Sequence, residues 1–425
     1  MLRHLLRRAP LWPATGAATL TATRTAVCNG DELELVHATA TFRHGARCPV
    51  FGLDSDVVKR VTWDSCAETA RLSDSVDQHK DAVLKLHADG GMRPSAVDAQ
   101  QRSHVLAGGA RAGELTSTGW AQARTLGTKL RERYGGPDFE DLRPRLECRT
   151  THVSRCVLTL RGVLLGLGFE EGSTPVEVAT NHASNETLTP STKRCPKLTA
   201  HWARCRDSLR TTCRHVDSAG PAFLSLVEKV PPDAAKTFNF PATAVPLKDA
   251  LIALASLAAE KMPWGVTREE LSALDDAAAA EVALLLGVGS SDGQDDLGAL
   301  QLAAGPLCQD VLAGLDAADA GSSEPTLTLL SGHDTTVKPL LVALGVYDHK
   351  SGGRVGGSPS SARRCGGRAI SHAPTSAQVA AVHGVRAHRS AAEPARRALG
   401  LPRALRRRDG RRSAHGAGGR LLRRV

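Results

Sequence analysis

The sequence predicts an α/β fold in which a doubly wound, mostly parallel sheet carries an inserted α-helical cap. Two extended apolar runs, at residues 33–42 and 326–332, each end directly in a polar cluster. Amphipathic helical patterns follow both runs, and strands that alternate with helices are typical of a parallel sheet. A long stretch rich in Ala and Leu, residues 170–320, separates them and shows helical patterns broken by Pro and Gly.

The first apolar run, LELVHATATF, alternates well enough to predict a buried strand. The cluster that follows it, RHGARCP, contains Arg43, His44 and Arg47. One interpretation is a solvated surface turn that ends at Pro49. The other is a binding site, because ligands of open α/β sheets bind in the crevice beyond the carboxyl ends of the strands. The concentration of polar residues within a few positions favours a binding site over a surface turn.

Two helices are predicted in the first half of the chain. The stretch from Gly113 to Gly136 has apolar residues at helical spacing and a candidate N-cap at Thr116 or Thr118. Residues 145–169 predict a short strand that turns into a second helix, with Arg155 in its first turns. Arg155 is therefore expected at the same end of the sheet as the first cluster.

Arginines and a histidine in this arrangement indicate phosphate chemistry. Arg43, Arg47 and Arg155 each present a permanently charged fork that holds two oxygens of a phosphate. Their positive charge favours the neutral form of His44, which leaves a ring nitrogen free to attack phosphorus. Because the arginines would neutralise the phosphoryl oxygens, neither a metal ion nor a cofactor is expected.

The second apolar run is followed by His333 and Asp334 at a sharp turn into another helix. Taken alone, Asp334 would be interpreted as a helix N-cap, since Asp caps well. With the first cluster in the same chain, we expect Asp334 to donate a proton to the leaving alkoxide, and both roles are compatible. General acid assistance by a carboxyl group favours mildly acidic pH.

The two ends of the chain differ from its body. Residues 1–30 contain arginines but no acidic residue and are rich in Ala and Thr, which predicts a transit peptide and a mitochondrial location, with secretion as the alternative. Residues 351–425 lack Lys and aromatic residues and are expected to be disordered. Its seventeen arginines and two acidic residues give this tail a formal charge of +15. Since the whole chain has a net charge of +10, residues 1–350 have a net charge of −5. The charge of the body therefore gives no support for nucleic-acid binding.

Other classes of site and partner receive little support from the sequence. None of the ten cysteines forms a C-x-x-C pair, and the spacing of Cys205 and Cys213 with His201 and His215 matches no standard zinc site. Disulfides among Cys195, Cys205 and Cys213 would need an oxidising compartment. No run of about twenty apolar residues predicts a transmembrane segment. The sequence leaves the oligomeric state undetermined.

Four blocks of sequence, RHGARCP, GELTSTG, RTTHVSR and SGHDTT, resemble in the same order the signatures of the histidine acid phosphatase branch of the histidine phosphatase superfamily. The resemblance covers roughly residues 31–350, and the segments AGELTSTG and LLVALGVYDHK look most like the mitochondrial members that act on lysophosphatidic acid. It implies a phosphoglycerate mutase-like fold, with a core at 31–169 and 321–350 and a cap at 170–320. It also implies roles for six residues: His44 as the phosphohistidine-forming nucleophile, Arg43, Arg47 and Arg155 as a phosphate clamp, His333 as a further phosphate contact and Asp334 as the proton donor.

The function implied by this resemblance is hydrolysis of a phosphomonoester, with a lysophospholipid as the expected substrate and inositol phosphates as the alternative. Thr150 stands where the family usually has Ser. The resemblance stops at Lys350, where the family continues with further sheet strands, so residues 351–425 are interpreted as the product of a shifted reading frame or a retained intron. A non-catalytic protein whose sheet lacks those strands is a second class of hypothesis. The third is that the basic tail, residues 351–425, is a nucleic-acid-binding module.

Overall fold

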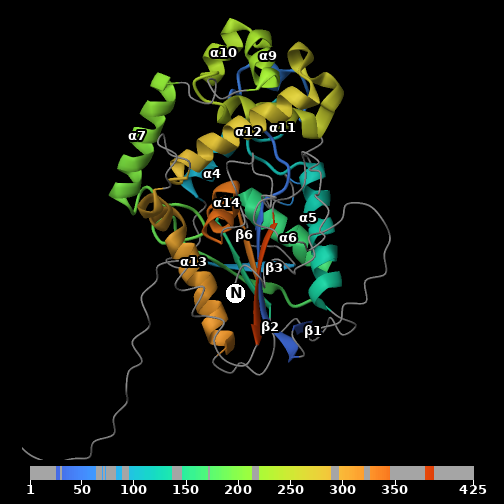
Figure 1. Cartoon of the computed structure of the whole chain (residues 1–425). Helices are drawn as coiled ribbons and strands as arrows, with labels where there is room; N and C mark the ends of the chain where they lie inside the picture. The colour runs from blue at the N-terminus through green and yellow to red at the C-terminus, as the bar shows by residue number, and fades with distance from the viewer. Residues whose placement is uncertain are drawn as a thin grey trace, which may run out of the picture. The chain divides into compact units, whose positions relative to one another are not determined.

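The strands of the computed structural model form one seven-stranded sheet, in the order β1-β2-β6-β4-β5-β3 with β7 also paired to β2 (Figure 1). The structure describes residues 25–28, 31–63, 69, 72, 83–88, 95–135, 146–170, 173–212, 220–288, 296–319, 326–344 and 379–386. The strands are β1 (Thr25–Cys28), β2 (Asp31–Arg43), β3 (Leu84–Ala88), β4 (Leu146–Thr150), β5 (Val176–Thr180), β6 (Thr326–Gly332) and β7 (Val379–Arg386). Strands β2, β6, β4, β5 and β3 run parallel, whereas β1 and β7 are antiparallel to β2.

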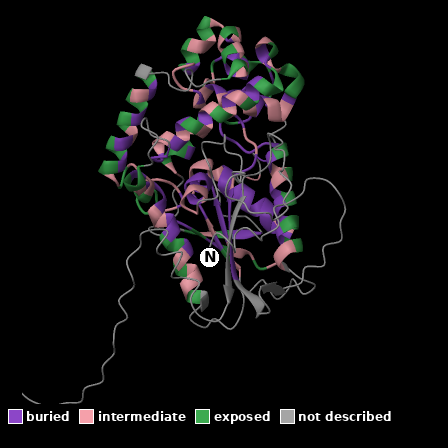
Figure 2. Ribbon diagram, viewed as in Figure 1, coloured by how far each residue is buried: buried purple, intermediate pink, exposed green. Residues whose placement is uncertain are grey.

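Both faces of the sheet are covered by helices, which confirms the predicted α/β fold. On one face, α5 (Ser117–Leu130) and α6 (Ser154–Leu167) pack on inward residues of the strands such as Phe42 and Leu329. On the other face, α13 (Leu297–Asp319) and α14 (Asp334–Ala343) pack around Leu330. Figure 2 shows the buried residues concentrated between these layers.

The helix predicted after Thr116 begins as expected. The Thr116 hydroxyl accepts a hydrogen bond from the Gly119 amide, 3.1 Å away, and so caps α5. The helix continues into a π-helical turn at Arg131–Gly135. A methyl group on Gly127 or Gly166 would overlap backbone of the facing helix, so these glycines let α5 and α6 cross closely.

A helical cap lies beyond the ends of the parallel strands (Figure 1). It consists of α9 (Pro221–Lys229), α10 (Pro232–Phe238), α11 (Val245–Ala258) and α12 (Arg268–Leu285), which share one apolar cluster with α2 (Asp56–Lys59). Two short turns, Ala259–Lys261 and Pro263–Gly265, join α11 to α12, and a Thr267–Glu270 capping box begins α12. The two other described helices are α4 (Ala96–Arg102) and α7 (Pro196–Thr212).

The cap is smaller than the predicted insertion at residues 170–320. Strand β5 belongs to the sheet, and α13 packs beside α14 on one sheet face. The sequence interpretation assigned both to the insertion because β5 is short and α13, with its many Ala and Leu, has the same helical pattern as the cap helices. Only the packing of α13 against the sheet distinguishes it from the cap helices.

The two ends of the described chain also differ from the expectation. Strand β1 lies within the predicted transit peptide of residues 1–30 and pairs with β2 from Thr25↔Glu34 to Cys28↔Asp31. Strand β7 lies within the tail that was expected to be disordered and pairs with β2 from Glu34↔Arg386 to Phe42↔Val379. The expected disorder is therefore wrong for residues 379–386, because eight residues suffice for a strand where an edge is free to pair. The rest of residues 1–30 and 351–425 lies outside the described residues.

Among the described residues, no helix is long and apolar enough to cross a membrane. Cys48, Cys148, Cys156, Cys195, Cys205 and Cys308 are free thiols. The disulfide considered between Cys195 and Cys205 is therefore absent, and Cys213 lies outside the described residues.

Candidate active site

The loop after β2 is the centre of the site and is fixed by backbone contacts on both sides. The His44 amide donates to the Gly332 carbonyl at the end of β6, and the Cys48 amide donates to the Glu114 carbonyl. A side chain on Gly45 would overlap the backbone of Gly119, so this glycine lets the loop lie directly against the first turn of α5. The loop therefore holds its side chains at the carboxyl end of the sheet, as predicted.

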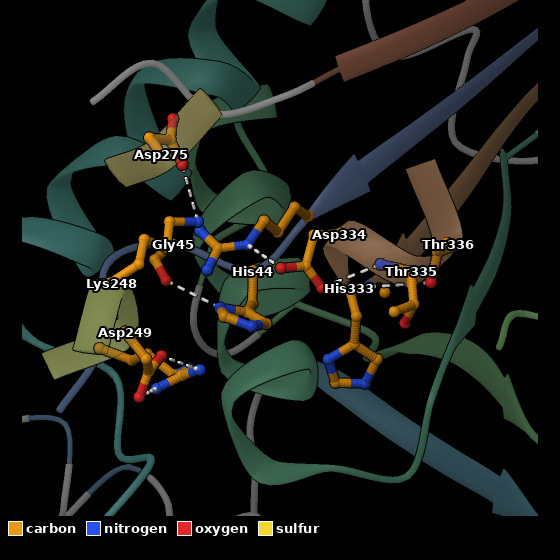
Figure 3. Close-up of polar contacts among 12 residues, drawn as sticks. His44, Gly45, Lys248, Asp249, Asp275, His333, Asp334, Thr335 and Thr336 are labelled. Atoms are coloured by element: carbon orange, nitrogen blue, oxygen red, sulfur yellow. Dashed lines mark hydrogen bonds and ion pairs between the residues drawn. The ribbon is translucent and has the colours of Figure 1, made fainter. Parts of the chain in front are cut away.

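His44 is buried at 3% exposure, and its Nδ1 lies 2.9 Å from the Gly45 carbonyl oxygen (Figure 3). Because a carbonyl only accepts, Nδ1 carries the proton and donates it to Gly45, which leaves a lone pair on Nε2. Burial lowers the pKa of His44 well below its ordinary value, and the positive charges of Arg43, Arg155 and Arg47 lower it further. The ring is therefore neutral through the mildly acidic range.

Arg47 is held by the cap. Its two terminal nitrogens bind both carboxylate oxygens of Asp249 on α11, at 2.7 and 3.4 Å, and one of them also donates to the Cys48 carbonyl. The buried Nε of Arg47 has no hydrogen-bond partner among the described residues. An unpaired, buried guanidinium N–H is costly, so it indicates a place for an anion.

Arg155 lies in the first turn of α6, near the positive end of the helix dipole. Buried Asp98 compensates this placement, since its carboxylate accepts from the Ser154 amide and lies 3.9 Å from Arg155. Gln101 accepts a second contact from Arg155 at 2.9 Å. Burial and the neighbouring Arg47 lower the pKa of Arg155 to about 10, so it stays charged, and its buried Nε is also unpartnered among the described residues.

His333 and Asp334 begin α14 directly after β6. His333 is the N-cap and Asp334 the first helical residue, so the cap expected at Asp334 lies one position earlier. The His333 Nε2 lies 3.2 Å from the Thr151 hydroxyl, and its ring stands edge-on to that of His44 with centroids 5.4 Å apart. Burial lowers the pKa of His333 to about 3, so this ring is neutral too.

Asp334 faces several positive groups. Its carboxylate lies 4.0 Å from Arg43 Nε. Burial would raise the pKa of Asp334, but the charges of Arg43 and then Lys248 outweigh burial and hold the pKa below its usual range. Lys248, which acts on Asp334, belongs to α11. Its Nζ also forms an ion pair with Asp275 at 3.0 Å (Figure 3).

The structure thus brings all six residues predicted from the sequence to one end of the sheet: Arg43, His44, Arg47, Arg155, His333 and Asp334. Sequence reasoning missed the partners that hold them, above all Asp98, Lys248 and Asp249. No local pattern distinguishes an Asp on an amphipathic helix that binds an arginine from one that faces solvent.

The described residues contain no group of three or more His, Cys, Asp or Glu side chains arranged to hold a metal ion. His201 and Cys205, which the zinc hypothesis named, lie 3.4 Å apart in α7, while Cys213 and His215 are outside the described residues.

Comparison with known proteins places this chain in a family. Residues 33–249 match the histidine phosphatase superfamily (branch 2). The chain is 29% identical over 332 residues to lysophosphatidic acid phosphatase type 6 of Bos taurus and 28% identical over 335 residues to that of Homo sapiens, in both cases covering 75% of this chain and 71% of the relative. A probable acid phosphatase of Schizosaccharomyces pombe is 29% identical over 177 residues, 39% of this chain and 38% of that protein.

Solved structures similar to this chain include a phytase of Klebsiella sp ASR1 and the multiple inositol polyphosphate phosphatase of Bifidobacterium longum in complex with phosphate. The former has a TM-score of 0.44 at 15% identity and covers 73% of this chain and 72% of its own. The latter has a TM-score of 0.46 at 13% identity, and the match covers 88% of this chain and 90% of the phosphatase chain.

Proposed function

Since the chain belongs to the histidine phosphatase superfamily (branch 2), we propose that it hydrolyses phosphate monoesters through a phosphohistidine at His44. The observation that carries this proposal is the hydrogen bond from His44 Nδ1 to the Gly45 carbonyl. It leaves the lone pair of a neutral imidazole on Nε2, in a ring on which the charges of Arg43, Arg155 and Arg47 act.

In the first step, Nε2 attacks phosphorus, the P–N bond forms and the bond to the leaving oxygen breaks. Arg43, Arg47 and Arg155 neutralise the phosphoryl oxygens as charge develops on them. Asp334 donates its proton to the leaving oxygen. In the second step, water attacks phosphorus and gives its proton to Asp334, the P–N bond breaks, and inorganic phosphate leaves with His44 neutral again.

The monoanionic form of the substrate explains how acidic conditions would favour this reaction although the pKa of Asp334 is low. In the free site Asp334 is ionised because Arg43 and Lys248 outweigh burial. A bound phosphate neutralises Arg43 and raises the pKa of Asp334, so the carboxyl group takes up a proton as substrate binds. A monoanionic phosphate ester supplies that proton, and this form is lost above its second pKa near pH 6, roughly. Turnover is therefore expected to fall as the pH rises above that range.

We propose a lysophospholipid as the substrate, supported by the names of the mammalian relatives. Such a substrate has an alkyl leaving group, whose oxygen is a poor leaving group without a proton. The Asp334 proton is therefore expected to matter more for a lysophospholipid than for an aryl phosphate with an acidic phenol.

The test compares the full chain with His44→Ala and Asp334→Asn, using an aryl phosphate, lysophosphatidic acid and inositol hexakisphosphate at mildly acidic pH. We expect His44→Ala to reduce turnover of the substrates by at least about 10³-fold, since the nucleophile is lost. Asp334→Asn should slow lysophosphatidic acid hydrolysis by about 10²- to 10⁴-fold and aryl phosphate hydrolysis much less.

His104→Ala is the matched control, because His104 is exposed and lies outside the site. Mass spectrometry of a reaction quenched without acid should find phosphate on His44. A folded wild-type chain without turnover would support the non-catalytic hypothesis instead, and faster release of phosphate from inositol hexakisphosphate would replace the lysophospholipid by the phytase-like substrate.

A further inference from the structure

We infer that Asp249 is a positioning residue for phosphate binding, which acts by orienting Arg47 from the cap. The inference rests on the proposed function, because it assigns the role of Arg47 as a phosphate ligand to a specific geometry. Asp249 is not one of the residues that the sequence motifs contain, and it lies about two hundred positions from Arg47 in the chain.

The contacts of Asp249 use both of its oxygens and are nearly buried. Oδ1 accepts from Arg47 at 2.7 Å, and Oδ2 accepts from Arg47 at 3.4 Å and from the Val50 amide at 2.9 Å. The side chains of Arg47 and Asp249 are 12% and 13% exposed. A two-point contact between a guanidinium and a carboxylate fixes the plane of the guanidinium, which a single contact does not.

This geometry decides which part of Arg47 remains for a ligand. Asp249 and the Cys48 carbonyl occupy the terminal nitrogens, whereas the buried Nε is unpartnered among the described residues. In Arg155, Gln101 binds one terminal nitrogen, and the buried Nε is likewise unpartnered among the described residues. Both arginines are thus held at a terminal nitrogen, and their Nε groups remain for an anion.

Asp249 also joins the cap to the loop after β2. It lies on α11 and binds Arg47 and Val50 of that loop (Figure 3). A purely structural role would stabilise the cap without affecting phosphate affinity. Glu281 offers a control for that role, because its carboxylate accepts from the Ala244 and Val245 amides at the start of the same helix.

Asp249→Asn is the sharpest substitution, because the amide has the same shape but only one acceptor oxygen. Whichever way the amide is turned, its NH₂ group faces an N–H donor of Arg47 or Val50. We expect the inhibition constant of inorganic phosphate and the KM for an aryl phosphate to rise about tenfold or more, with a smaller change in kcat. Glu281→Gln should lower the melting temperature at least as much and leave the inhibition constant of phosphate unchanged.

A double-mutant cycle separates positioning from structure. In the Arg47→Ala background Asp249 is a carboxylate without its cationic partner, and it repels phosphate. Asp249→Asn should then tighten phosphate binding in that background, the opposite of its effect in the wild type.

Four outcomes would overturn the inference. An unchanged phosphate inhibition constant in Asp249→Asn, or an equal rise in Glu281→Gln, would overturn it while leaving the proposed function intact. The same weakening by Asp249→Asn in both backgrounds would show that Asp249 does not act through Arg47. A folded wild-type chain that neither hydrolyses an aryl phosphate nor binds phosphate would overturn the proposed function as well.

Discussion

The tautomer of His44 is set by one backbone carbonyl. Gly45 accepts from Nδ1 at 2.9 Å, so Nε2 is the nitrogen without a proton. The sequence indicated a neutral histidine among arginines, but the choice of nitrogen depends on the turn that places the Gly45 carbonyl beside the ring. At this scale, the neutral state of His44 depends first on its burial and then on the neighbouring arginines, and the orientation of its ring depends on the fold.

The buried histidines predict how the stability of the protein depends on pH. In the unfolded chain His44 and His333 take up protons near pH 6.5, whereas in the folded chain the pKa of His44 is far lower and that of His333 is about 3. The unfolded state therefore binds more protons below pH 6.5, and the free energy of unfolding falls as the pH decreases from there toward 3. Each histidine contributes a slope of about 1.4 kcal/mol per pH unit at most.

Urea unfolding at pH 6.5 and pH 5 measures this slope. His333→Asn should reduce the loss of stability between the two pH values, while His104→Asn, at an exposed position, should leave it unchanged. A wild-type chain equally stable at both values would contradict neutral, buried histidines. Inorganic phosphate is expected to restore stability at pH 5, because it binds only the folded site.

At the scale of elements, the crossing of α5 and α6 depends on two glycines. A Cβ on Gly127 would overlap the Val163 carbonyl, and a Cβ on Gly166 would overlap the Arg124 carbonyl. Alanine is the better helix former by about 0.5–1 kcal/mol, but here it would push the helices apart. Arg155 lies at the start of α6, one of the two helices that cross here.

Gly166→Ala is therefore expected to lower the free energy of unfolding by about 1–3 kcal/mol, as for overpacked cores. Gly305→Ala is the matched control, because Gly305 lies within α13 and a Cβ there has no neighbour within 4 Å. Because Gly305 precedes Pro306, whose ring crowds the Cβ of the residue before it, the gain in helix propensity is offset, and that substitution should change the free energy of unfolding much less than Gly166→Ala. Chemical denaturation measures the free energy of unfolding of the two variants, and stabilisation by Gly166→Ala would show that the helices do not pack as closely as described.

At the scale of the whole molecule, β1 and β7 cover the edge of β2, the strand that carries the site. Strand β1 pairs with residues 31–34 and β7 with residues 34–42. An uncovered strand edge exposes unpaired N–H and C=O groups to other chains. The tail therefore contributes backbone hydrogen bonds to the sheet even though its composition predicts disorder.

Two truncations test this contribution. A chain that ends at residue 387 keeps β7 and should remain monodisperse and as active as the full chain. A chain that ends at residue 350 exposes the β2 edge and should aggregate faster and melt at a lower temperature, measured by light scattering and calorimetry. Equal behaviour of the two truncations would show that β7 does not stabilise the sheet.

The sequence by itself determined the α/β class, a helix that begins after Thr116 or Thr118 and the six polar residues that the structure brings to one end of the sheet, because these depend on local periodicity and on residues next to strand ends. The mitochondrial location inferred from residues 1–30 stays a prediction. Only the tertiary structure decided that α13 packs on the sheet, that β7 joins it and that Asp249 orients Arg47. These features depend on contacts between residues far apart in the chain, and a helical or apolar pattern has the same appearance whichever partner it meets.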